Sequence, residues 1–257
     1  MRVALTGAAT GIGAEVAARL KRNGHEVVAF DINEPEANTD RWIHTDLGDA
    51  SSIAASLEAA DGQFDALVNN AGLPPREGLT EAVLKVNYFG LKAFLDGMIE
   101  KLQPGGSIVN TASRAGAMWR DNLDEVKALM ALDPADLSGF VDARNIDSTR
   151  AYNLSKEAVI VLTMAQTERL HARKLRINSV SPAAVSTGIL PDFTAAFGDR
   201  VTKNVARVGR PGEPSEVADV ILFLLSPQSH WINGQDLVID GGMGAMIASD
   251  MMGFHGQ

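Results

Sequence analysis

Short apolar runs alternate with longer amphipathic stretches along most of this 257-residue chain, and no other feature restricts its fold so strongly. The apolar runs are partly β-branched and are bounded by Gly, Asn, Asp or Pro, which is typical of buried strands. We predict strands at Val3–Leu5, Glu26–Phe30, Ala66–Val68, Ser107–Asn110, Arg176–Val180 and Leu237–Ile239, and helices at Gly13–Asn23, Ser51–Ala60, Thr80–Leu102, Ala151–Arg173 and Pro214–Leu225. This order predicts an α/β fold, a doubly wound parallel sheet of Rossmann type with helices on both faces.

One stretch interrupts the alternation, between the strand that ends near Asn110 and the helix that begins near Ala151. A structureless loop of that length is unusual inside a compact domain. Apolar residues at helical spacing in Asp121–Leu132, followed by an Asp-Pro pair typical of a helix start, predict an inserted helical hairpin at about residues 118–147. Since no linker or change of composition divides the chain, we expect one domain over residues 1–257.

The charge and the residue content exclude several classes of function. The formal net charge is −9, and an acidic surface repels nucleic acids and anionic membranes. The chain has no cysteine, which excludes disulfides, thiolate catalysis and cysteine metal ligands. We find neither a signal peptide nor an apolar run of about eighteen residues. We therefore expect a cytoplasmic protein with no metal site and with a small molecule, rather than nucleic acid or membrane, as its partner.

A glycine-rich turn connects the first predicted strand, Val3–Leu5, to the first helix. Gly7, Gly11 and Gly13 allow a tight turn and let the backbone approach a ligand closely. The helix that follows presents free N–H groups and the positive end of its dipole, which suit a pyrophosphate. An ordinary strand–helix turn is the alternative, but the position between the first strand and the first helix favours dinucleotide binding.

An acidic residue at the end of the second strand indicates which dinucleotide binds. Asp31 stands 18 residues after Gly13, near the distance expected of a carboxylate that binds the ribose 2′-hydroxyl. That carboxylate would repel a 2′-phosphate, and positions 8–10 and 32 offer no Arg or Lys to a phosphate. NAD is therefore favoured over NADP. A solvated aspartate at the strand end is the alternative interpretation.

Four side chains suggest acid–base chemistry. Tyr152 and Lys156 are four positions apart on a predicted helix and share one face, so the ammonium can lower the pKa of the phenol. Ser113 lies at the carboxyl end of a predicted strand, where α/β sheets bind ligands. Asn87 lies within a predicted helix that it does not favour. Taken singly, these residues also fit an ordinary helix pair, a turn or cap serine, and a polar residue at a kink.

Several motifs together resemble the short-chain dehydrogenase/reductase family from one end of the chain to the other. In order they are Thr6-Gly7-(x)3-Gly11-Ile12-Gly13, Asn69-Asn70-Ala71-Gly72, Asn87, Ser113, Tyr152-(x)3-Lys156, Pro182 with Thr187, and Asp240-Gly241-Gly242. Each motif alone is common, whereas the ordered set is highly specific.

The resemblance implies a role for each matched residue. Tyr152 would be the general acid/base, Ser113 would polarise the substrate oxygen, Lys156 would tune Tyr152 and bind ribose, and Asn87 would support a water that connects Lys156 to solvent. The implied cofactor-binding residues are Gly7, Thr10, Gly11, Ile12, Gly13, Asp31, Asp46, Leu47, Asn69, Ala71, Gly72, Tyr152, Lys156, Pro182, Val185 and Thr187.

The sequence departs from the family pattern at two places. Ala183 replaces the glycine that usually follows the proline of the Pro182 segment. Tyr152 follows Ser113 by 39 residues, far more than the family's usual dozen or so. The extra length is similar to the subgroup of bacterial 3α-hydroxysteroid dehydrogenase/carbonyl reductase and coniferyl alcohol dehydrogenase.

The expected substrate pocket is apolar. Its wall is expected in the substrate loop at about residues 187–208 and in the insert, with Met118, Trp119, Ile189, Leu190, Phe193 and Phe197 as candidate contacts. Such a wall favours a bulky, largely apolar substrate of the aromatic alcohol or hydroxysteroid type. The resemblance thus implies an NAD-dependent alcohol dehydrogenase or carbonyl reductase. A non-catalytic NAD(H)-binding regulator on the same fold is the alternative.

The resemblance also implies a homo-oligomer, a dimer or a tetramer. Family members commonly pair through helices that correspond here to Thr80–Leu102 and Ala151–Arg173, and the insert precedes the second of these. The insert is therefore expected to cap the active site, obstruct that pairing, or do both. The methionine-rich segment Gly234–Gln257 is expected at an interface or at the rim of the pocket.

Overall fold

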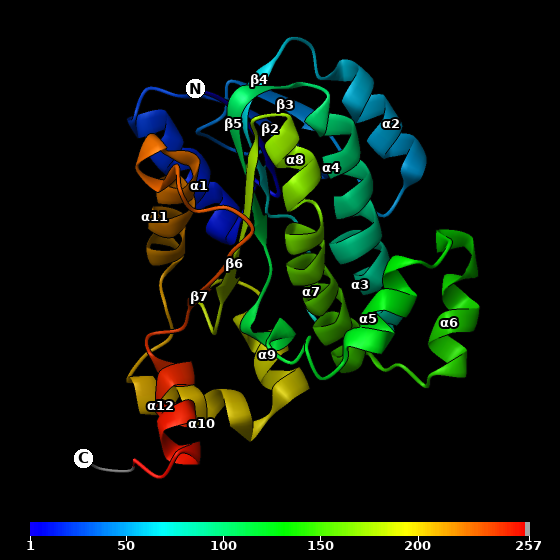
Figure 1. Cartoon of the computed structure of the whole chain (residues 1–257), viewed down its shortest axis with the longest axis vertical. Coiled ribbons are helices and arrows are strands. Elements are labelled where there is room, and N and C mark those ends of the chain that lie inside the picture. The colour runs from blue at the N-terminus through cyan, green and yellow to red at the C-terminus, as the bar shows by residue number, and fades with distance from the viewer. Residues whose placement is uncertain (255–257) are drawn as a thin grey trace.

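Seven parallel strands form one sheet in the computed structural model, which describes residues 1–254 (Figure 1). Their order across the sheet is β3-β2-β1-β4-β5-β6-β7. The strands are β1 (Arg2–Thr6), β2 (Glu26–Asp31), β3 (Arg41–His44), β4 (Phe64–Asn69), β5 (Leu102–Thr111), β6 (Arg176–Pro182) and β7 (Asp236–Ile239). The order reverses between β1 and β4, which is the crevice where doubly wound sheets bind their ligands. The predicted fold class is confirmed.

Helices cover both faces of the sheet. On one face lie α1 (Gly11–Arg22) and α11 (Pro214–Leu225), which pack against each other. On the other face lie α2 (Ala50–Ala59), α3 (Thr80–Leu84), α4 (Leu91–Ile99), α7 (Ser148–Ala165) and α8 (Thr167–Ala172) (Figure 1). Successive residues of a strand point into different cores on the two faces of the sheet. Ala4 packs on the face covered by α2, α3, α4, α7 and α8, whereas Val3 and Leu5 pack on the face covered by α1 and α11. This alternation follows from the two-residue period of a strand.

The structure differs from the predicted elements at three places: one strand was missed, and two predicted helices have other bounds. Strand β3 was not predicted, because only Ile43 of its residues is fully buried and the strand shows no apolar run. The helix predicted over Thr80–Leu102 is three pieces, with a π-helical turn at Lys85–Gly90, and Leu102 already belongs to β5, where it pairs with Phe64. The helix predicted over Ala151–Arg173 begins earlier and is divided into α7 and α8.

The insert forms the predicted helical hairpin. Its helices are α5 (Leu123–Met130) and α6 (Leu137–Ala143), with a 3₁₀ turn before α6. Both bury apolar side chains, among them Leu129 and Phe140. Helix α5 packs on α7, and α6 packs on α3, so the insert contacts both of the helical regions through which subunits were expected to pair. The assembly state stays a prediction.

Two further segments fold into helices at the carboxyl edge of the sheet (Figure 1). Residues 187–208, hereafter the lid, contain α9 (Leu190–Phe197) and α10 (Asp199–Val208). Helix α12 (Met243–Met251) contacts α10. The last part of the predicted methionine-rich tail, residues 255–257, lies outside the described residues. Within residues 1–254, no helix has the length and apolar character needed to cross a membrane.

Candidate active site

A cavity of about 1350 Å³ opens at the carboxyl edge of the sheet. Its walls come from the loops that follow the parallel strands, from the lid, from the start of α7 and from α12. Glycine and acidic residues of the loops after the first strands line one end of the cavity, and aromatic and aliphatic side chains of the lid and the insert line the other. The carboxyl edge is where open α/β sheets carry their sites.

The glycine-rich turn forms part of the first end of the cavity. Gly7 has a φ of +70°, and a Cβ on it would lie 2.7 Å from the Cα of Ala71. A Cβ on Gly13 would lie 1.8 Å from the carbonyl oxygen of Gly7, so this position tolerates no side chain. Gly13 is buried and does not line the cavity, whereas Gly7, Thr10, Gly11 and Ile12 do. Gly13 therefore acts by letting α1 approach the turn.

Acidic side chains line the same end. The carboxylate of Asp31 accepts hydrogen bonds from the backbone N–H groups of Ala9 (2.9 Å) and Asn33 (3.0 Å), which fix its orientation at the end of β2. Asp46 and Leu47 line the cavity beside it. Each carboxylate oxygen of Asp31 still has a lone pair, so the group can accept bonds from a ribose diol.

The two neighbouring asparagines after β4 differ in position. The side chain of Asn69 is buried and donates to Asn110, and it does not line the cavity. Asn70 does line the cavity, donates to the carbonyl of Gly7 and accepts from the hydroxyl of Thr111. Sequence reasoning missed Asn70, although it stands in the same motif as Asn69. Ala71 and Gly72 line the cavity as expected from the sequence.

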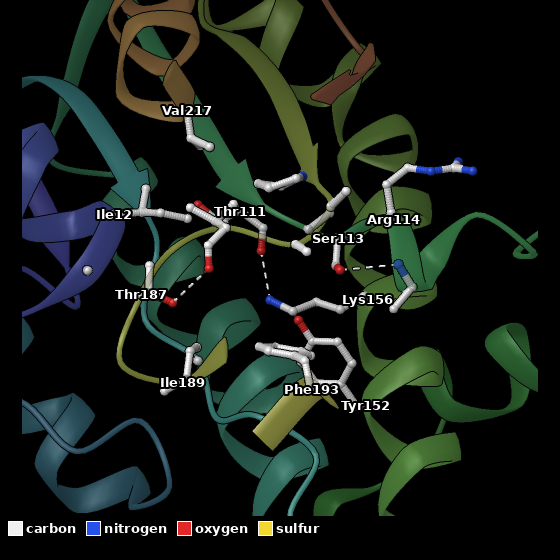
Figure 2. Close-up of a pocket in the computed structure, with 18 of the residues that line it drawn as sticks. Ile12, Thr111, Ser113, Arg114, Tyr152, Lys156, Thr187, Ile189, Phe193 and Val217 are labelled. Atoms are coloured by element: carbon white, nitrogen blue, oxygen red, sulfur yellow. Dashed lines mark hydrogen bonds between the residues drawn. The ribbon is translucent and has the colours of Figure 1, made fainter. Parts of the chain in front are cut away.

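Tyr152, Lys156 and Ser113 meet at the middle of the cavity (Figure 2). The ammonium nitrogen of Lys156 lies 5.8 Å from the centre of the Tyr152 ring and donates to the carbonyl oxygen of Thr111 at 2.8 Å. Ser113 caps a 3₁₀ turn, and its hydroxyl accepts from the N–H of Ala115 and also hydrogen-bonds with Tyr152. Tyr152 and Lys156 from α7 and Ser113 from the turn after β5 thus form one cluster of side chains.

Burial determines the proton affinities of the two titratable groups. Loss of solvent raises the pKa of Tyr152 to about 12, and the hydrogen bond with Ser113 acts in the opposite direction. Loss of solvent also lowers the pKa of Lys156 to about 8. Both shifts favour neutral forms, as expected in a low-dielectric environment. The sequence-based expectation of a lowered pKa for Tyr152 is therefore wrong, because burial has the larger effect.

Asn87 is completely buried in the π-helical turn and does not line the cavity. Its carbonyl oxygen accepts from the N–H of Leu73 at 2.7 Å, and its amide donates to the carbonyl of Leu73 at 3.0 Å. These two bonds fix the segment after β4, including Gly72, next to Lys156. Asn87 thus holds the backbone of this segment through its side-chain amide.

The other end of the cavity is apolar. Met118, Ile189, Phe193 and Phe197 line it, and the ring centres of Phe193 and Tyr152 are 5.2 Å apart in an edge-on contact (Figure 2). Trp119 and Leu190 do not line the cavity. The cavity is also lined by Pro182, Val185 and Thr187, the three remaining residues of the implied cofactor site.

Sequence comparisons identify the family. Residues 2–123 match the family described as "short chain dehydrogenase", and residues 136–244 match the one described as "Enoyl-(Acyl carrier protein) reductase". The coniferyl-alcohol dehydrogenase of Pseudomonas sp. (strain HR199 / DSM 7063) is 33% identical over 245 residues, which cover 94% of this chain and 96% of the relative. The chain belongs to the short-chain dehydrogenase/reductase family, as its motifs predicted.

Two further relatives have a similar length and fold. The 3-alpha-hydroxysteroid dehydrogenase/carbonyl reductase of Comamonas testosteroni is 32% identical over 252 residues, which cover 95% of this chain and 97% of the relative. The crystal structure of the 3-alpha-hydroxysteroid dehydrogenase from Pseudomonas sp. B-0831, complexed with NADH, superposes with a TM-score of 0.85 at 34% identity, covering 97% of this chain and 99% of that chain. These relatives belong to the subgroup that the long insert indicated.

Proposed function

We propose that this protein is an NAD-dependent dehydrogenase that transfers a hydride between NAD(H) and an alcohol or carbonyl group of a bulky, largely apolar substrate. One observation carries the proposal: Tyr152, Ser113 and Lys156 meet where the glycine- and acid-lined end of the cavity joins its apolar end. The NADH-bound relative and the dehydrogenases named above support the same reaction class.

The residues at the first end fit NAD. The N-terminus of α1 and the left-handed glycines offer free N–H groups and close approach for a pyrophosphate. Asp31 offers acceptors to an adenosine ribose diol, and its negative charge opposes a 2′-phosphate. When bound, the cofactor supplies the hydride acceptor or donor.

In the proposed mechanism, Ser113 donates a hydrogen bond to the substrate oxygen and orients it toward Tyr152. During alcohol oxidation Tyr152 takes the hydroxyl proton, and during carbonyl reduction it returns one. The positive charge of Lys156 stabilises the phenolate that oxidation requires. Asn87 holds the Leu73 segment, which keeps the backbone beside Lys156 in place. Phe193 and Phe197 exclude water from the reacting oxygen.

The test is an NAD-reduction screen with the purified chain over aromatic allylic alcohols, hydroxysteroids and simple secondary alcohols. We expect turnover with one of the first two classes and weak turnover with the third, because only a bulky substrate fills the apolar end. The alternative, a non-catalytic NAD(H)-binding regulator, predicts NADH binding by fluorescence with no turnover of any alcohol, ketone or aldehyde. The cytoplasmic location and the homo-oligomeric assembly remain separate proposals.

A further inference from the structure

The lid, residues 187–208, forms one wall of the cavity and contacts the core through partly buried side chains, among them Phe193 and Phe197. Neither α9 nor α10 contains a fully buried residue. Ile189, Phe193 and Phe197 nevertheless face the cavity, and the two phenylalanine rings contact the ring of Tyr152. A segment with so little burial has a low free energy of local opening. Its position over Tyr152 therefore depends strongly on the few polar contacts that connect it to the body.

One such contact joins the lid to the segment after β4. Arg76 donates from Nε and Nη2 to the two carboxylate oxygens of Asp192, each at 2.8 Å. Paired parallel bonds of this kind are the strongest geometry for an arginine–carboxylate pair. The Arg76 guanidinium holds the pKa of the Asp192 carboxyl below its usual range. The pair joins two segments that lie 116 residues apart in the sequence.

Arg76 and Asp192 each belong to a segment that contributes residues to the proposed active site. Arg76 belongs to the segment that carries Ala71 and Gly72 and that Asn87 fixes through Leu73. Asp192 lies in the first turn of α9, where a carboxylate also interacts favourably with the helix dipole. The next residue, Phe193, is the one whose ring packs edge-on against Tyr152. The guanidinium thus connects the cofactor side of the cavity to the aromatic side chain over the catalytic phenol.

We propose that Arg76 is a positioning residue: its ion pair with Asp192 holds the lid closed, so that Phe193 stays against Tyr152 and the substrate end of the cavity stays formed. The pair acts on substrate binding rather than on the proton transfer, because neither side chain lines the cavity. It is partly exposed, with 53% of the Arg76 side chain and 22% of the Asp192 side chain accessible. Salt will therefore screen it and loosen the lid.

The experiment measures lid opening without any assumption about the reaction. Mass spectrometry follows the cleavage by trypsin after Lys203, an exposed residue of α10. The proteins compared are the unmodified full chain, the single variants Arg76→Gln and Asp192→Asn, and the charge-reversed double variant Arg76→Asp/Asp192→Arg. The matched control is Arg173→Gln, which removes another exposed guanidinium that bonds both oxygens of a carboxylate, that of Glu100, far from the lid. Both Gln variants remove one trypsin site outside the lid, and the double variant adds one at position 192, so only fragments that end at Lys203 are counted.

We expect each single lid variant to raise the cleavage rate after Lys203 about fivefold, the scale of one partly exposed ion pair, and the charge-reversed double variant to restore it. Cleavage of the unmodified chain should also accelerate with added salt, whereas cleavage of Arg76→Gln should not. Rates for Arg76→Gln and Asp192→Asn that match Arg173→Gln would overturn the proposal.

The kinetic half of the experiment rests on the proposed dehydrogenase function. With a substrate from the screen, Arg76→Gln should raise the substrate KM about fivefold while kcat changes less than twofold, since the acid–base groups are intact. A fall in kcat with an unchanged KM would contradict the positioning role. If the chain turns over no substrate but Lys203 becomes more accessible in the lid variants, the dehydrogenase proposal fails and the lid proposal stands.

Discussion

The two ends of the cavity are built by different means. The glycine- and acid-lined end, where we propose that NAD(H) binds, is formed by loops directly attached to buried parallel strands, and its backbone is held by bonds such as Ala9 to Asp31 and Asn70 to Gly7. The apolar end, where we propose that the substrate binds, is formed by two segments added to the sheet, the insert and the lid. A rigid sheet edge can define a general nucleotide site, whereas added segments can change from one relative to another without disturbing it.

The two added segments also differ from each other. The insert buries Leu129 and Phe140 and is tied to α7 by Arg150, which donates to both Glu125 and Glu157. Glu157 is only 1% exposed, whereas the side chains of Arg150 and Glu125 are 25% and 27% exposed, so the network is anchored on one buried carboxylate. The lid buries no residue completely, and the ion pair of Arg76 with Asp192 that connects it to the body is partly exposed. The comparison suggests one fixed wall and one movable wall for the substrate.

The largest effect is expected where the two ends meet. Tyr152→Phe removes only the hydroxyl, so folding and NADH binding should be retained while kcat falls about a hundredfold or more, the scale of a lost acid/base group. Steady-state kinetics with a substrate from the screen gives kcat, and NADH fluorescence gives the binding. Near-normal turnover would show that the cluster of side chains between the ends is not the reacting centre.

The next largest effect separates the fixed wall from the movable one. Arg150→Met leaves the buried carboxylate of Glu157 without its cation, beside a second carboxylate on Glu125, and should reduce the free energy of unfolding by about 3 kcal/mol. Urea denaturation measures it. The double variant Arg150→Met/Glu157→Met should recover most of the loss, because no unpaired charge remains. Arg76→Gln in the lid should change the urea midpoint far less, and equal losses would refute the distinction.

A smaller effect tests the cofactor end alone. Asp31→Ala removes the acceptor for the ribose diol, so the Kd for NADH should rise about tenfold, the value of a charge-assisted hydrogen bond, and the preference over NADPH should diminish. Fluorescence titration with both cofactors gives the two constants. The substrate KM should hardly change if the two ends are independent. Equal catalytic efficiency of the unmodified chain with NAD and NADP would contradict the assignment.

The smallest effect concerns the pH dependence of Tyr152 and Lys156, which lie where the two ends of the cavity meet. Because burial lowers the pKa of Lys156 to about 8 and raises that of Tyr152 to about 12, the first proton leaves mainly from Lys156. Carbonyl reduction needs both groups protonated, so its kcat/KM should be flat below about pH 8 and fall above it.

Alcohol oxidation needs a deprotonated Tyr152 beside a protonated Lys156. This form has lost one proton, as has the more abundant form in which Tyr152 is protonated and Lys156 is neutral, so the two forms appear together as the pH rises. The kcat/KM of alcohol oxidation should therefore rise with pH up to about 8 and then level off. Initial rates across this range test both profiles. Lys156→Arg keeps its charge and should lose the inflection, and an inflection that persists would assign it to another group.

The sequence alone determined the features that local spacing encodes. The alternation of apolar runs and helical patterns determined the layered sheet, the glycine spacing determined the turn after β1, and the four-residue spacing of Tyr152 and Lys156 put them on one face of α7. The long interval between Ser113 and Tyr152 also indicated the insert and its subgroup. In each case a short-range period or a steric requirement of the backbone carries the information.

Only the tertiary structure decided the contacts between distant segments and the choice between neighbours. Asn70 lines the cavity and Asn69 does not, since successive residues near a strand end point to opposite sides of the sheet. The tertiary structure also brought Arg76 to Asp192 across 116 residues and buried Lys156 enough to lower its pKa. Such contacts and desolvation depend on how complete layers pack, and no local period in a sequence specifies them.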